Sequence, residues 1–109
     1  MSALEVAQAY QTHINDGDAD ALLALFADDA VVLHPVGEFH GPAEIRGFYE
    51  ANVLPFHIRM GAVSWVHDDD RCVFEIEARA EAGGPATYAI DHMTVEGGHI
   101  VRLAVYYRR

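Results

Sequence analysis

The stretch ATYAIDHMTVEGGHIVRLAVYY, residues 86–107, decides the fold. Apolar and polar residues alternate with a period of two on both sides of Gly97-Gly98, as is typical of β-strands that bury one face. Two adjacent glycines between such runs predict a tight turn. We therefore expect antiparallel strands over residues 86–96 and 99–107.

The same period extends back toward Pro55 and predicts two more strands, at about residues 57–67 and 71–81. The polar run DDD at 68–70 and the run GGP at 83–85 predict the turns that join these strands. Four antiparallel strands in succession, connected by short turns, form a meander.

The first half of the chain shows helical spacing instead. Apolar residues recur at intervals of three and four over residues 3–15, which predicts an amphipathic helix. Ser2 followed by Glu5 fits a capping box, and Gly17 can adopt the left-handed conformation that ends a helix. The apolar residues of this stripe are Leu4, Ala7, Tyr10 and Ile14.

A second, shorter helix is expected directly after the first one. Either Asp18 or Asp20 can cap its start. Its leucine-rich segment runs to Phe26, and Asp28 with Asp29 is expected to close it.

Residues 30–34, AVVLH, are rich in β-formers and predict a strand that ends before Pro35. Residues 37–41 predict a turn or a short hairpin. Pro42 is favourable in the first turn of a helix, so a third helix is expected from residue 43 to about 53. Helices on one side of a curved sheet make the fold class α+β.

The length of 109 residues corresponds to a single domain, residues 1–109. The chain has 17 acidic residues and 7 basic ones, all arginine, which gives a formal net charge of -10. This balance excludes a nucleic acid or an anionic membrane as partner, because phosphates are bound by clustered positive charge. It favours a neutral or cationic ligand.

A single cysteine, Cys72, cannot form a disulfide within the chain. The first residues, MSALEVAQAY, lack the basic flank and apolar run of a signal peptide. No apolar run approaches the roughly 20 residues that span a bilayer. We therefore expect a soluble, cytoplasmic protein.

Asp91 is the residue of the alternating stretch that carries potential chemistry. If its face is covered, desolvation raises the pKa of the carboxyl, which can then stay neutral and donate a hydrogen bond. The alternative, slightly favoured by the pattern alone, is an outward face with an ordinary solvated acid. The residues that share its face are Ala89, Met93 and Val95.

The neighbouring strands also divide into two faces. One side of the sheet is apolar and the other is charged, so the apolar side forms either a plain core or a core with an open pocket at its mouth. On the strand at 71–81 the apolar face holds Cys72, Phe74, Ile76, Ala78 and Ala80. On the last strand Val101, Leu103, Val105 and Tyr107 oppose Ile100, Arg102, Ala104 and Tyr106.

Three local segments resemble the ketosteroid isomerases (steroid delta-isomerases), which belong to the broader NTF2-like or SnoaL-like group. They are ALFADDA at 24–30 followed by HPVG at 34–37, IRGFY at 45–49, and IDH at 90–92. The resemblance covers nearly the whole chain. It implies a cone of curved, mostly antiparallel sheet wrapped over three helices, with an internal pocket and an assembly of two identical chains.

The resemblance also assigns roles. Tyr10 matches the family's oxyanion-hole tyrosine, and Asp91 matches its second donor, an aspartic acid kept protonated. Tyr49 matches a tyrosine that supports the first one. His34 stands where the family has its proton-shuttling aspartate, which is the main departure. Phe26 stands where some members have another tyrosine.

His34 can nevertheless serve as a base. An imidazole has an ordinary pKa of about 6.5, so it is a stronger base than a carboxylate and is largely neutral at pH 7. The imidazolium that it forms would also attract the negative charge of an enolate. The alternative is a strand-end histidine bonded to a backbone carbonyl.

The expected pocket is apolar and needs no organic cofactor. A metal site built from His34 and His40 with Asp91 or His92 is the alternative, but the spacings do not match those of known metal sites, so no metal is expected. The residues expected to line the pocket are Ile14, Phe26, Phe48, Phe56, Phe74, Ile76, Ala78, Met93, Leu103, Val105 and Tyr107.

Three functions are compatible with this sequence. The first is an isomerase that shifts a proton next to the carbonyl of a small hydrophobic cyclic ketone. The second is a SnoaL-like cyclase or dehydratase. The third is a non-catalytic binding or dimerisation module in which Tyr10, His34 and Asp91 satisfy one another. In each case a homodimer through the outer face of the sheet is expected.

Overall fold

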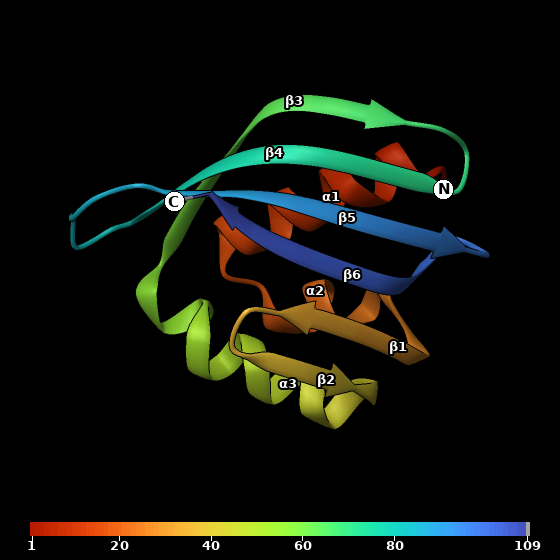
Figure 1. Ribbon diagram of the computed structural model, residues 1–109. Helices are drawn as coiled ribbons and strands as arrows, with labels where there is room; N and C mark the ends of the chain where they lie inside the picture. The colour runs from red at the N-terminus through yellow and green to blue at the C-terminus, as the bar shows by residue number, and fades with distance from the viewer. Residues whose placement is uncertain (109) are drawn as a thin grey trace.

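The computed structural model describes residues 1–108 and shows an α+β fold with one six-stranded sheet (Figure 1). The helices are α1 (Ala3–Asp16), α2 (Ala19–Ala24), α3 (Gly41–Asn52) and the short 3₁₀ helix η1 (Leu54–Phe56). The strands are β1 (Phe26–His34), β2 (Gly37–His40), β3 (Ile58–His67), β4 (Arg71–Ala80), β5 (Thr87–Glu96) and β6 (His99–Arg108). None of the helices in this part of the chain combines the length and apolarity needed to cross a membrane.

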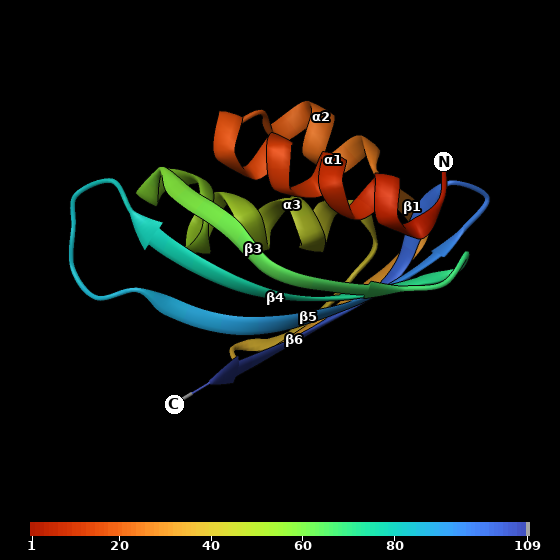
Figure 2. The same cartoon turned by 90° about the horizontal axis from the view of Figure 1, so that it is seen from above.

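The sheet has the strand order β2-β1-β6-β5-β4-β3, and its last four strands form the predicted antiparallel meander. Strand β1 pairs with β6 in parallel and forms a hairpin with β2. The sheet is curved, and the three α-helices lie together on its concave side (Figure 2). Helix α1 packs against β3, β4 and β5, whereas α3 packs against β1. The core lies between these two layers.

Helix α1 begins and ends where its sequence predicts. The Ser2 hydroxyl accepts a hydrogen bond from the Glu5 amide, and the Glu5 carboxylate accepts one from the Ser2 amide, so the capping box is complete. At the other end Gly17 has a φ of 66°, which a residue without a Cβ adopts at no steric cost. The stripe of apolar residues buries Ala7, Tyr10 and Ile14.

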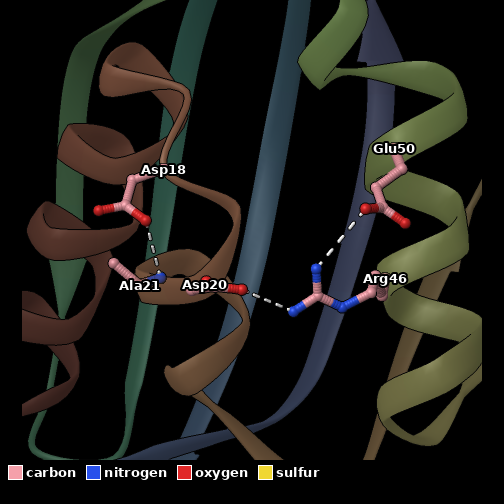
Figure 3. Close-up of polar contacts among 5 residues, drawn as sticks. All are labelled: Asp18, Asp20, Ala21, Arg46 and Glu50. Atoms are coloured by element: carbon pink, nitrogen blue, oxygen red, sulfur yellow. Dashed lines mark hydrogen bonds and ion pairs between the residues drawn. The ribbon is translucent and has the colours of Figure 1, made fainter.

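Helix α2 is shorter than predicted. Asp18, not Asp20, is its cap, because the Asp18 carboxylate accepts from the Ala21 amide (Figure 3). The prediction that the helix continues to Phe26 is wrong, as is the prediction that Asp28 and Asp29 close it, since all three lie in β1. Pairing of this segment with β6 through Phe26 and Ile100 overrides the helical tendency of its leucines.

A β-bulge changes the face of one residue in β6. Simple alternation places Ile100 on the outer face with Arg102, but Ile100 is fully buried. The register between β5 and β6 shifts between Thr94 and Val95, so that Val95 pairs with Ile100 while Thr94 pairs with Arg102. The extra residue at a bulge moves the side chains that follow it to the opposite face.

The helices α2 and α3 are connected on the surface by one arginine. The Arg46 guanidinium lies 2.9 Å from the Asp20 carboxylate and 3.5 Å from that of Glu50 (Figure 3). All three side chains are solvent-exposed. Exposed ion pairs contribute little to stability, so this contact adds little to the packing of the two helices.

Candidate active site

A cavity of about 170 Å³ lies between the helices and the concave face of the sheet. Its residues come from α1, from α3 and the residue that follows it, and from every strand except β2, so both layers of the fold form it. The lining residues are Tyr10, His34, Phe48, Tyr49, Asn52, Val53, Ile58, Met60, Ile76, Ala78, Thr87, Ala89, Asp91, Val105 and Tyr107.

Asp91 is the only acidic or basic residue in the buried core of residues 1–108, and 2 % of its surface is exposed. It points to the concave face, between Phe74 of β4 and Val105 of β6. Its Oδ1 atom is buried and has no hydrogen-bond partner within the described residues. Burial raises the pKa of the carboxyl to about 7, because a charge is poorly solvated there. The outward orientation that the sequence pattern slightly favoured is therefore wrong.

Tyr10 of α1 and Tyr49 of α3 form a hydroxyl pair in the same cavity. Their Oη atoms are 2.8 Å apart, and both side chains are buried. One hydroxyl donates to the other, and the accepting hydroxyl keeps its own proton for a further acceptor. Burial, together with the charge of Asp91, raises the pKa of both phenols well above the ordinary value, so both stay protonated at neutral pH.

Three aromatic contacts hold the Tyr10 ring in place. The Tyr10 ring meets the rings of Phe26, Phe74 and Tyr49 edge to face, at centroid distances of 6.2 to 6.5 Å. These geometries are the favoured ones for aromatic pairs and fix the direction of the phenol. Phe26 and Phe74 therefore support the site from the core side without reaching the cavity surface.

His34, the last residue of β1, stands at the rim of the cavity beside Tyr107 of β6. The His34 Nε2 atom lies 2.7 Å from the Tyr107 Oη, and the imidazole packs against the Phe48 ring at 4.7 Å. The side chain is half-buried. Partial burial lowers the pKa of the imidazole below its ordinary value of 6.5, so the ring is neutral at pH 7.

The protonation of the two ring nitrogens follows from a backbone contact. The Val36 amide donates to the His34 Nδ1 at 3.2 Å. An amide can only donate, so Nδ1 carries the lone pair and the proton of the neutral ring is on Nε2. The Nε2–H group therefore donates to the Tyr107 hydroxyl. His34 does bond to the backbone, as the structural alternative expected, but to an amide and not to a carbonyl.

The three polar groups of the site do not satisfy one another. Tyr10 is bonded to Tyr49, His34 is bonded to Tyr107 and Val36, and the Asp91 Oδ1 is left without a partner. A cavity also lies beside them. This arrangement differs from the one expected of a purely structural cluster, in which each polar group would be paired.

Some of the residues expected along the pocket lie elsewhere. Met93, Leu103, Phe26 and Phe74 are buried in the core and do not line the cavity. Ile14 is also buried but faces a separate groove near Gly17. Phe56 lies in η1 and is half exposed, since the chain leaves α3 and runs outward there. The expected residues that do line the cavity are Phe48, Ile76, Ala78, Val105 and Tyr107.

Six residues of the cavity lining were not anticipated. Ala89 shares the face of Asp91 and could have been found from the same alternation. Asn52 follows Tyr49 by one helical turn, which is a weaker signal. The position of β3 over the cavity is set by the curvature of the sheet, which residue spacing does not reveal. The six residues are Asn52, Val53, Ile58, Met60, Thr87 and Ala89.

His34 and His40 have separate partners. His40 lies 3.9 Å from Glu38 on the exposed β2 strand. Over residues 1–108 no three histidine, cysteine or acidic side chains come together in a group that could hold a metal ion.

Comparison with known proteins now gives the class. Residues 6–103 match the SnoaL-like domain family, and the chain belongs to this family. The match begins within α1 and ends in the middle of β6, so it includes every lining residue of the cavity except Val105 and Tyr107.

Solved structures agree with the fold. A protein from Kribbella flavida DSM 17836, proposed to be a ketosteroid isomerase, is 15% identical with a TM-score of 0.85, over 96% of this chain and 76% of that one. A protein from Sinorhizobium meliloti, proposed to be a polyketide cyclase, is 22% identical with a TM-score of 0.83, over 93% of both chains. A computationally designed 17-OHP binder is 21% identical with a TM-score of 0.87, over 99% of this chain and 92% of that one. At these identities the likeness concerns the fold.

Proposed function

We propose that this protein is an enzyme that shifts a proton next to the carbonyl of a small, hydrophobic cyclic ketone, in the manner of the ketosteroid isomerases. The observation that carries the proposal is the Asp91 carboxyl, which lines an apolar cavity, is nearly inaccessible to solvent and has an Oδ1 without a partner. Such a group is costly unless something binds to it. A carbonyl oxygen in the cavity is the acceptor that its neutral form lacks.

The oxyanion would be stabilised from two sides. A neutral Asp91 donates its O–H, and the Tyr10–Tyr49 pair donates the one proton that its mutual hydrogen bond leaves free. Donors that are fixed in position in an apolar cavity need no reorganisation as charge develops on the oxygen. The loss of one such donor typically slows catalysis by 100-fold or more.

His34 is the proposed proton carrier, because it is the one histidine that lines the cavity. The C–H bond beside the carbonyl breaks, its electron pair moves into the enolate, and the proton goes to Nδ1. The weak bond from the Val36 amide is given up in this step. The imidazolium keeps its Nε2–H bond to Tyr107 and returns the proton to another carbon of the enolate.

The size of the cavity limits the substrate. A volume of about 170 Å³ is below the roughly 300–1,000 Å³ of pockets that take drug-sized ligands. One or two fused rings fit this space better than a complete steroid. 3-Cyclohexenone and a β,γ-unsaturated steroid ketone are therefore the two substrates to compare.

The test follows the ultraviolet absorbance of the conjugated enone that forms from each substrate. We expect turnover of the smaller ketone above the buffer rate, a loss of at least 100-fold in His34→Ala, and no change in His13→Ala, a partly buried histidine that does not line the cavity. The rate should fall above about pH 7 as Asp91 ionises and again below the pKa of His34. Turnover equal to buffer, or indifferent to His34→Ala, would remove the proposal for these substrates.

A cyclase or dehydratase is the second proposed function, favoured by the family itself and by the structural likeness to the Sinorhizobium meliloti protein. Deprotonation beside a carbonyl starts these reactions too, so the same donors and His34 would act. A panel of polyketide-like hydroxyketones, monitored for loss of water or ring closure, separates them from isomerisation.

Non-catalytic binding of a small apolar molecule is the third. Both ring nitrogens of His34 are already engaged, by the Val36 amide and by Tyr107, and a designed relative in this fold is a binder. Tight binding of ketones with no turnover in any assay would favour this function over the two enzymatic ones.

The proposal includes a homodimer formed through the outer face of the sheet. Ile90 and Tyr106 pair across β5 and β6, and both expose large apolar surfaces. Sedimentation should show a species of about twice the 12.0 kDa chain mass, and a single 12.0 kDa species at high concentration would refute it. A cytoplasmic location is also proposed, in keeping with the free thiol of Cys72.

A further inference from the structure

Tyr107 stands between two hollows of the molecule. One is the inner cavity that holds Asp91. The other, named here the outer groove, is a wider space of about 690 Å³ at the end of β1 and β6. His34, Val105 and Tyr107 line both. The remaining residues of the outer groove are Leu33, Pro35, Glu38, Ala104, Tyr106 and Arg108.

The hydrogen bonds of this pair leave one proton unused. The Val36 amide occupies the lone pair of the His34 Nδ1, so His34 donates from Nε2 to the Tyr107 Oη. A phenol carries one proton of its own in addition to its acceptor lone pairs. No acceptor for that proton is found among residues 1–108. A hydroxyl that accepts one hydrogen bond also becomes a better donor, because hydrogen bonds in a chain polarise one another.

The strand register separates this hydroxyl from the Asp91 carboxyl. Asp91 pairs with Val105, whereas Tyr107 pairs with Ala89. Tyr107 is therefore two residues further along the same face, which corresponds to roughly 7 Å between side-chain bases. The wall between them is apolar and is made by Val105 and Ala89. The cavity thus has two separate proton donors with a hydrophobic span between them.

We propose that Tyr107, held by His34, donates a hydrogen bond to a second oxygen of the ligand, so that the ligand is a flat, apolar molecule of one or two rings with oxygen functions at two separated positions. The inference rests on the proposed function, which places the first oxygen at Asp91. It makes Tyr107 a determinant of specificity, and it makes His34 the residue that fixes the direction of the Tyr107 hydroxyl.

Two probes of the same ring system test this. 2-Naphthol has one oxygen, and 2,6-dihydroxynaphthalene has one at each end. Their affinities for the wild type, Tyr107→Phe and Tyr88→Phe are measured by calorimetry at pH 6. Tyr107→Phe should weaken the diol about 3- to 10-fold, the range expected for one neutral hydrogen bond, and 2-naphthol by less than 2-fold. Tyr88 lines neither hollow, so Tyr88→Phe should change neither affinity.

The outcomes separate this inference from the proposed function. If 2-naphthol binds and loses affinity in Asp91→Leu, but Tyr107→Phe affects both probes equally or neither, the role of Tyr107 is overturned while the site at Asp91 stands. If neither probe binds to the wild type, the proposed site fails and the role of Tyr107 fails with it.

A second measurement uses the unmodified chain and does not depend on the folding of a variant. The nitrogen chemical shifts of the His34 ring at pH 7.5 report its tautomer. We expect the proton on Nε2 and an unprotonated Nδ1. A ring protonated at Nδ1 would instead accept a hydrogen bond from the Tyr107 hydroxyl at Nε2. Tyr107 would then have no proton to donate to a ligand, and the inference would be overturned.

Discussion

Asp20 and Asp91 carry the same side chain in opposite circumstances. The Asp20 side chain is 91% exposed and accepts from Arg46 at 2.9 Å on the surface (Figure 3). Asp91 is 2% exposed, and its Oδ1 has no partner. The surface carboxylate of Asp20 contributes little to stability, whereas the buried carboxyl of Asp91 lowers stability at neutral pH. A residue that breaks the rules of a good core in this way marks the place where a protein gives up stability for function.

Of the substitutions that test this contrast, removing the charge of Asp91 is expected to change the free energy of unfolding most. The folded-state pKa of about 7 lies above the ordinary value of 3.8, so the carboxyl's stabilising contribution is complete below pH 4 and is lost as the pH rises through about 7. Asp91→Asn cannot ionise. Its free energy of unfolding should exceed that of the wild type by about 3–4 kcal/mol at pH 8, and by much less at pH 5.

Urea denaturation of both proteins at the two pH values gives this difference. Asp20→Asn is the matched control, and its free energy of unfolding should equal that of the wild type at both pH values. An Asp91→Asn variant that is less stable than the wild type at pH 8 would show that the carboxyl is well solvated or paired.

A smaller change in the free energy of unfolding is expected on mutation of the Tyr10–Tyr49 pair. These buried hydroxyls differ from Asp91 because each has a hydrogen-bond partner. Tyr10→Phe leaves the Tyr49 hydroxyl buried and unpaired, which should cost about 1–3 kcal/mol. Tyr10→Phe with Tyr49→Phe removes both partners and should recover much of that loss. A double-mutant cycle on thermal or urea unfolding measures the coupling, and strictly additive losses would contradict a shared hydrogen bond.

The fold could be predicted from the sequence to a large extent, because its signals are local. Strand alternation after Pro55, the Ser2–Glu5 capping box and the glycine at position 17 each specify geometry within a few residues. The predictions failed where pairing between strands distant in sequence determined the secondary structure or the face of a residue. Phe26 joined β1 because β6 was there to pair with it, and Ile100 turned inward because of a bulge in the register.

The site could be predicted only in part. Tyr10, Tyr49, His34 and Asp91 do meet at one cavity. The partners of these groups could not be foreseen, because a hydrogen bond such as that of His34 with Tyr107 joins residues 73 positions apart. Which face of β5 is covered also depends on how the helices pack, and the alternation alone pointed slightly the wrong way for Asp91.

The smallest effect is expected at the surface contact between α2 and α3. Arg46→Ala removes the ion pairs to Asp20 and Glu50, both of which are exposed. Solvent and salt screen such pairs, so the unfolding midpoint should stay within error of the wild type at 0.15 M salt. A loss as large as that of Tyr10→Phe would show that the surface contact, and not the core, holds α3 over the cavity.

The most direct test of this account is the titration of Asp91 itself. The carboxyl carbon of aspartate labelled with ¹³C is followed by nuclear magnetic resonance from pH 4 to 9, with Asp91→Asn to assign the signal. We expect a midpoint near pH 7, caused by burial in the cavity. A midpoint near the ordinary value of 3.8 would mean a solvated carboxylate and would contradict a neutral donor at this site.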